Sequence, residues 1–135
     1  MKIDKQDHKA LVLWATDCGE HVLRFFEEKY PKDHRPRLAL EAARAWVRDE
    51  IAVSEVRATA FAAHAAARDA EDHATRAAAR SAGHAAATVH VASHARHAAD
   101  YAAKAAATPA ERSWQYKRLP EHLRAFVKVS NPEDR

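Results

Sequence analysis

The sequence predicts an all-α protein, a compact bundle of about five to six helices that contains an Ala-rich helical hairpin. Ala has the highest helix propensity of all residue types, and 34 of the 135 residues are Ala. Only two Gly and five Pro interrupt the chain, and the β-branched residues that favour sheets are sparse. The length suits one domain, which we place at residues 1–129, followed by a flexible C-terminal tail at residues 130–135.

The first helix is expected from about His8 to Lys29, with Asp7 as its N-terminal cap. Tyr30-Pro31 ends it, because the residue before a Pro avoids helical backbone angles. The apolar residues of this segment recur at spacings of three and four, as they do on one face of a helix. They are Leu11, Trp14, Ala15, Cys18, Val22, Phe25 and Phe26.

Two more helices are expected before residue 70. Pro36 suits a first-turn position and starts a helix that covers roughly Arg37 to Glu50. Ser54 caps a third helix, which ends at about Asp69. The inward stripes are Ala39, Ala42, Ala43 and Trp46 in the second helix, and Val56, Ala60, Ala63 and Ala67 in the third.

The helical pattern that Glu71-Asp72 opens is compatible with two arrangements. A single helix could run unbroken to Ala107. Alternatively, the chain pauses near Val91-Ala92 and Ser93 caps a fifth helix. We favour the pause.

Small side chains dominate the middle of the chain, since 25 of the 50 residues at positions 58–107 are Ala. Helices of this kind bury little apolar area, but they can approach to about 8 Å. We therefore expect an Ala-rich hairpin held by the aromatic residues of the two chain ends. The C-terminal end restarts at Thr108-Pro109, with a helix at residues 110–119 and a last short turn from Pro120 through Val127.

Charge and cysteine content exclude several classes of protein. The formal net charge is +3 and no segment is a dense basic block, so we do not expect a nucleic-acid partner. The single cysteine, Cys18, allows no intramolecular disulfide and should be a buried, inert thiol on the apolar stripe. There is no signal-peptide pattern and no apolar run of about 18 residues. The expected location is therefore cytoplasmic, with no membrane partner.

The ten His residues are the unusual feature of the composition. On a continuous helix over residues 76–101, one stripe at steps of four and three would contain Arg76, Arg80, Gly83, Ala87, His90, His94, His97 and Tyr101. His90, His94 and His97 are candidate metal ligands, because imidazoles one turn apart can share an ion. The favoured interpretation is a partly solvated stripe, or imidazoles hydrogen-bonded within the bundle, with no metal or cofactor bound.

The sequence does not predict an enzyme. In helix-based zinc peptidases a Glu follows the first His, and Val91 stands in that place after His90. No Ser has nucleophile-elbow context, and no Gly-rich phosphate loop is present. On the third helix, His64 and Arg68 share a face with Phe61 and could hold an acidic group of a partner.

A series of short motifs stands in a specific order along the chain. They are Leu13-Trp14-Ala15, Asp17-Cys18, Phe26-Glu27-Glu28-Lys29-Tyr30-Pro31, Arg35-Pro36-Arg37, Ala45-Trp46, Ala63-His64-Ala65-Ala66-Ala67-Arg68, Ala79-Arg80-Ser81-Ala82-Gly83, Ala87-Thr88-Val89-His90-Val91, His94-Ala95, Glu111-Arg112 and Trp114-Gln115-Tyr116. In order and spacing, over about residues 10–118, they resemble the immunity proteins related to the fifth immunity group of bacterial polymorphic toxin systems.

That resemblance implies an all-helical cytosolic protein that binds and neutralises a cognate protein toxin. The residues that match family motifs and could form a polar interaction site are His64, Arg68, Arg80, His90 and His94. Uncovered Ala-rich faces would also allow a homodimer. Two alternatives remain open: a His-rich bundle that binds a metal ion or small ligand, and a helical protein that associates weakly with nucleic acid.

Overall fold

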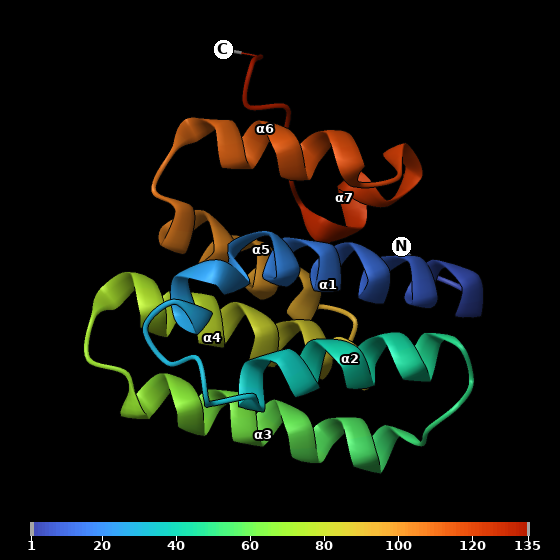
Figure 1. Ribbon diagram of the computed structural model, residues 1–135. Coiled ribbons are helices and arrows are strands. Elements are labelled where there is room, and N and C mark those ends of the chain that lie inside the picture. The colour runs from blue at the N-terminus through green and yellow to red at the C-terminus, as the bar shows by residue number, and fades with distance from the viewer. Residues whose placement is uncertain (1, 135) are drawn as a thin grey trace.

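The computed structural model describes residues 2–134, and over that range all regular secondary structure is helical, with no strand (Figure 1). The predicted all-α bundle is therefore confirmed. The elements are α1 (Lys5–Glu27), α2 (Arg35–Val47), α3 (Val53–Asp69), α4 (His73–Ala87), α5 (His94–Ala106), α6 (Pro109–Arg118), the 3-10 turn η1 (Glu121–Leu123) and α7 (Arg124–Val127). The single-turn helix α7 is the short turn expected after Pro120.

The first helix begins earlier than predicted, at Lys5, because Asp4 rather than Asp7 is its cap. The Asp4 carboxylate accepts a hydrogen bond from the backbone N–H of Asp7 at 2.8 Å. Asp7 instead lies in the first turn, where a negative charge is favourable near the helix N-terminus. The helix also ends slightly early, at Glu27.

The second helix is displaced toward the N-terminus relative to the prediction. It begins at Arg35, with Pro36 in its first turn as expected. It ends at Val47 rather than Glu50, because Asp49 has a φ of 61°, in the left-handed region that a right-handed helix cannot contain.

The middle of the chain forms two helices rather than one. α4 ends at Ala87 and α5 begins at His94, so the favoured pause is confirmed. Ser93 is the residue at the N-cap position of α5, but its hydroxyl makes no capping hydrogen bond. The prediction that Ser54 caps α3 was wrong, since Ala52 holds that position without a side-chain cap.

The α4 helix is the centre of the bundle and packs against α1, α2, α3 and α5 (Figure 1). Its buried residues are all Ala, Ser, Thr or Gly. These small side chains permit close approach to neighbouring helices. At the crossing with α1, a Cβ added to Gly19 would lie 3.6 Å from the Cα of Ala82 and 2.9 Å from a methyl group of Leu40.

The C-terminal helices lie on the side of α1 and α5 that is remote from α3 (Figure 1). The indole N–H of Trp14 in α1 donates to the Gln115 carbonyl oxygen of α6 at 2.8 Å. Leu119, Leu123 and Val127 are buried in the same core. The ends of the chain therefore close one side of the bundle.

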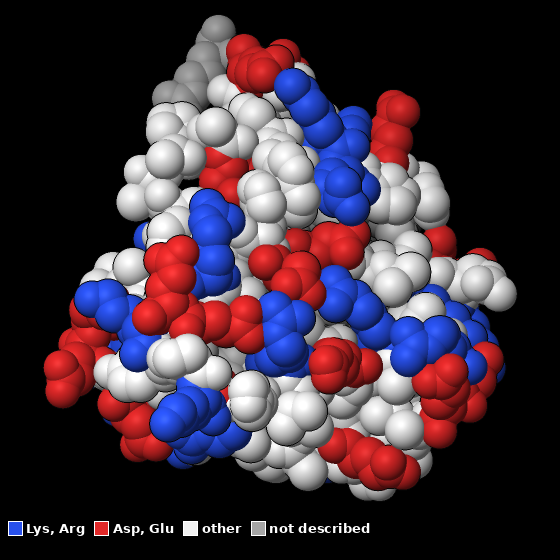
Figure 2. Space-filling view, in the orientation of Figure 1, with Lys and Arg blue, Asp and Glu red and all other residues white. Residues whose placement is uncertain are grey.

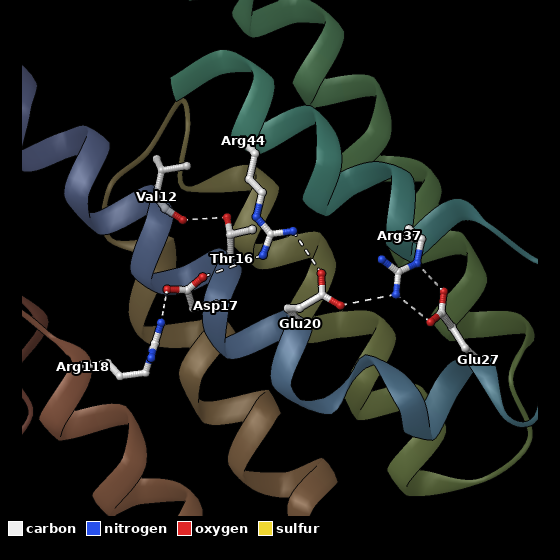
Figure 3. A network of polar contacts seen from close by, with 8 residues as sticks. All are labelled: Val12, Thr16, Asp17, Glu20, Glu27, Arg37, Arg44 and Arg118. Carbon is white, nitrogen blue, oxygen red and sulfur yellow. Dashed lines mark hydrogen bonds and ion pairs between the residues drawn. The ribbon is translucent and has the colours of Figure 1, made fainter. Parts of the chain in front are cut away.

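Six charged residues form a continuous series of ion pairs across α1, α2 and α6, which we call the salt-bridge chain (Figure 3). Its members are Glu27, Arg37, Glu20, Arg44, Asp17 and Arg118.

All contacts of the salt-bridge chain are hydrogen bonds except the one between Arg44 and Asp17, whose charged atoms lie 3.8 Å apart. Arg37 binds the Glu27 carboxylate through two N–H groups, at 2.7 and 2.8 Å. Glu20 accepts hydrogen bonds from Arg37 at 3.3 Å and from Arg44 at 3.0 Å. Figure 2 shows positive and negative groups interleaved over this face. The charges here are thus largely neutralised within the protein.

Residues 130–134, the described part of the predicted tail, contain no helix, and Glu133 lies 3.7 Å from Lys117. Arg135 lies outside the described residues. None of the helices found over residues 2–134 has the length and apolar character needed to cross a bilayer.

Candidate functional site

Five imidazoles gather where α3, α4 and α5 pack together, and we call them the imidazole cluster. They are His64 of α3, His84 of α4, His90 of the connecting turn, and His94 and His97 of α5.

His84 is the centre of the imidazole cluster. Its ring centroid lies 4.8 Å from that of His64, 5.3 Å from His94 and 5.2 Å from His97. Tyr101 stacks on the same ring at 5.3 Å with an interplanar angle of 5°. The rings therefore form a packed aromatic group rather than separate surface side chains.

Two polar contacts within the cluster constrain the protons of its rings. A guanidinium N–H of Arg80 lies 2.9 Å from Nδ1 of His64. Because Arg can only donate, Nδ1 of His64 accepts and that ring is neutral. The Nδ1 atoms of His84 and His94 are 3.1 Å apart, so one nitrogen donates and the other accepts.

The surroundings keep these rings neutral. Burial, assisted by the charges of Arg80 and Arg68, lowers the pKa of His64 to about 4. Burial, with the neighbouring imidazoles and Arg80, lowers the pKa of His84 to about 3. Burial also lowers the pKa of His94, assisted by its neighbours His97 and His90. At neutral pH the centre of the cluster is thus uncharged.

Gly83 provides the space that the His64 ring occupies. A Cβ added to Gly83 would lie 2.6 Å from Cε1, 2.8 Å from Nε2 and 2.9 Å from Nδ1 of that ring. Because real Cβ contacts are longer, any other residue here would displace the imidazole. The small residue on α4 and the large one on α3 are therefore complementary.

Four cations surround the imidazole cluster: Arg57, Arg68, Arg80 and Lys104. Arg57 contributes, after burial, to lowering the pKa of His90. The ammonium group of Lys104 lies 4.7 Å from the centroid of the Tyr101 ring. Within residues 2–134, no ion pair joins any of the four to a carboxylate. This distinguishes them from the arginines of the salt-bridge chain.

Two large apolar side chains lie exposed on the helices and turn that carry these groups. Phe61 of α3 is 66% exposed, and Val91 in the turn before α5 is 43% exposed. We define the basic face as the imidazole cluster, the four cations, Tyr101, Phe61 and Val91. It combines positive charge with aromatic and apolar area, which is the composition of many protein-binding surfaces.

The structure brings the predicted polar interaction site together on the basic face. His64 bonds to Arg80, and the rings of His90 and His94 lie 6.0 Å apart. Arg68 is close enough to His64 to contribute to lowering its pKa. These five residues come from α3, α4, α5 and the turn that joins α4 to α5.

The predicted stripe on one helix was wrong in its geometry, because the chain turns at residues 88–93. Arg76 leaves the stripe and donates to the Ala70 carbonyl oxygen at 2.6 Å. His84, which the sequence analysis missed, becomes central only because α5 folds back beside α4. No spacing in the sequence could have indicated it, since its partners are brought to it by packing.

No group of three or more His, Cys, Asp or Glu side chains is arranged to hold a metal ion anywhere in residues 2–134. For the candidate ligands, the ring centroids of His90 and His94 are 6.0 Å apart and those of His94 and His97 are 5.8 Å apart.

A second polar cluster, also missed from the sequence, joins α6 to α1. Glu111 is only 4% exposed, and its carboxylate lies 2.8 Å from Nδ1 of His21, in close contact rather than as an aligned hydrogen bond. His21 stacks on Trp114 with ring centroids 3.7 Å apart. Cys18 is fully buried nearby, as predicted, and burial raises the pKa of its thiol. This cluster packs helices together and offers no accessible nucleophile.

No curated protein and no solved structure matches the chain. A protein-family model described as "Imm-5 like putative immunity protein" matches residues 1–122, which include every helix from α1 to α6 and the whole basic face. The chain therefore belongs to the Imm-5 like family of immunity proteins.

Proposed function

We propose that this protein binds and neutralises a cognate bacterial toxin through a protein–protein interface, in the cytoplasm. The observation that carries the proposal is membership of the Imm-5 like family over residues 1–122. The proposal needs no catalytic group, because a protein that occupies the working surface of a toxin inhibits it by binding alone.

The physical character of the bundle supports an inhibitory role by binding. A surface built on rigid helices loses little conformational entropy when a partner binds. Here the helices are held by a core in which Leu11, Phe26 and Leu40 are almost fully buried. The sole cysteine in the sequence is buried with a raised pKa, which argues against thiol chemistry.

The proposal is tested by co-expression with the toxin encoded beside this gene. We expect the protein to restore growth of cells that produce the toxin and to elute with a catalytically inactive toxin as one complex in size-exclusion chromatography. A toxin from an unrelated gene neighbourhood serves as the control and should remain lethal. Failure both to restore growth and to form a complex would refute the function.

A further inference from the structure

We infer that the basic face of α3, α4 and α5 is the surface that receives the toxin, and that it recognises an acidic protein surface with carboxylates on both sides of an apolar contact. This inference rests on the proposed function and names the chemistry of its partner. It is carried by four cations that pair with no carboxylate of residues 2–134 and that lie around a group of packed imidazoles.

Ion pairs between side chains are distributed unevenly across the molecule. Arg37, Arg44 and Arg118 already bind carboxylates of α1. Asp69, the carboxylate next to Arg68 in the chain, pairs with Arg35 of α2 at 3.1 Å. The four cations of the basic face are not neutralised by carboxylates within residues 2–134, so a complementary negative surface would be attracted there.

Removing water from the centre of the basic face requires little free energy. Covering a charged group costs far more free energy than covering a neutral aromatic ring. His64 and His84 are neutral at pH 7 and already half-buried among other rings. Attraction can thus come from the arginines while neutral rings and apolar groups form the contact area.

The residue types on the basic face indicate the class of its partner. A surface for nucleic acid would present mainly phosphate-binding cations along a groove. This face instead places an exposed Phe61 between Arg57 and Arg68 on α3. Aromatic residues and Arg are the types enriched at protein interfaces. The mixture favours an acidic protein surface.

The spacing of the two arginines defines the pattern expected on the partner. Arg57, Phe61 and Arg68 are four and seven residues apart along α3, which places them on one side of the helix. At about 1.5 Å per residue, the two arginine positions are about 16 Å apart along the helix axis. The toxin should therefore carry carboxylates about that far apart, with an apolar patch between them.

The test measures the Kd for the neighbouring gene's toxin in catalytically inactive form. Charge reversal by Arg57→Glu and by Arg68→Glu should weaken binding about tenfold or more each, because each turns an attraction into a repulsion. Both side chains are exposed, so the fold should survive, and circular dichroism and thermal melting check that it does. Arg24→Glu in α1, with the same change of charge on an exposed residue, is the matched control and should change Kd less than twofold.

Reciprocal rescue gives a sharper readout. Replacing the toxin carboxylate that faces Arg68 by Lys should restore binding to the Arg68→Glu variant and weaken binding to the wild-type protein. Phe61→Ala should weaken binding without changing its dependence on salt, whereas Arg57→Glu should reduce that dependence.

The outcomes separate the two levels of the proposal. If the wild-type protein does not bind the toxin, the proposed function fails and the inference fails with it. If it binds but the Arg57→Glu/Arg68→Glu double variant binds within twofold of wild type, only the assignment of the basic face is overturned. A third outcome would assign the face to nucleic acid instead. In it, the wild-type protein binds a 20-base-pair DNA duplex at 50 mM NaCl, and the double variant loses this DNA binding but still binds the toxin.

Discussion

At the scale of single residues, the basic face depends on the packing of the large His64 ring against Gly83, which has no side chain. Gly83 has ordinary helical backbone angles, so its role is not conformational freedom. It leaves room on α4 for the His64 ring of α3, which in turn accepts a hydrogen bond from Arg80. Replacing Gly by Ala normally stabilises a helix. At position 83 that stabilisation is opposed by the steric conflict between the added methyl group and the His64 ring.

We predict that Gly83→Ala fails to stabilise the wild-type protein but stabilises a His64→Ala variant by up to about 1 kcal/mol. The added methyl group collides with the imidazole only when the imidazole is present. Urea denaturation of the four proteins in this double-mutant cycle measures the coupling free energy. Equal stabilisation in both backgrounds would show that the ring does not occupy the space above Gly83.

A second residue-scale prediction concerns pH. The pKa of His84 is about 3 in the folded protein, below its ordinary value of 6.5, so the unfolded chain takes up the proton first. The free energy of unfolding is therefore highest above pH 6.5 and falls as the pH drops toward 3. From pH 7.5 to pH 5, the free energy of unfolding of His84→Gln should therefore fall by about 1 kcal/mol less than that of the wild-type protein, after allowance for the partial exposure of the ring.

Urea denaturation at several pH values in that range measures how steeply the free energy of unfolding changes with pH, which we call the slope. The groups that face His84 are His64, His94, His97, Tyr101 and Arg80, and they remain in the variant. His73→Gln, at an exposed position in the first turn of α4, makes the same chemical change and is the control for the substitution itself. An unchanged slope in His84→Gln would contradict the assignment.

At the scale of elements, the salt-bridge chain aligns α1 with α2 and α6 (Figure 3). Its members are partly exposed, so each pair alone contributes little. Glu20 is the branching point, because it contacts both Arg37 and Arg44. A network of this kind has a larger effect on which helices lie side by side than on total stability.

We predict that Glu20→Gln lowers the free energy of unfolding by about 0.5 to 1 kcal/mol, because two arginines lose a charged partner. Glu50→Gln is the matched control, since the one partner of Glu50 within residues 2–134 is the nearby and exposed Arg48. Its effect should be too small to measure by urea denaturation. In 1 M NaCl the difference between the two variants should shrink, since salt screens exposed charges.

At the scale of the whole molecule, stability comes from helices that approach closely around α4. Ala82 is fully buried, and its Cα comes within 3.6 Å of the position of a Gly19 Cβ. Such a core has no space for larger side chains at its centre, because protein interiors are already close-packed. The bundle therefore tolerates enlargement at its surface and not at α4.

We predict that Ala82→Leu destabilises the protein by about 1 to 3 kcal/mol or prevents folding, through overpacking against α1. Ala110→Leu, on the exposed side of the first turn of α6, makes the same chemical change and should be nearly neutral. Thermal melting of the two variants compares them directly. A melting temperature for Ala82→Leu equal to that of wild type would show that α1 and α4 are not closely packed there.

The sequence by itself determined the elements, because the signals that start and stop helices are local. The Ala-rich segments and the restart at Thr108-Pro109 were predicted without a structure, and the pause before Ser93 was the favoured one of two arrangements. The ends of an element were harder to predict where two residues could each cap the helix, as with the Asp4 and Asp7 carboxylates at the start of α1. The family resemblance likewise followed from the order of motifs.

Only the tertiary structure decided which residues meet. His84 became the centre of the imidazole cluster because α5 turns back along α4, and Arg37 found Glu27 because α2 folds against α1. Helix propensity and capping act over a few residues, whereas these contacts join positions ten or more apart. Their partners are selected by the packing of whole helices, and no periodicity within one segment contains that information.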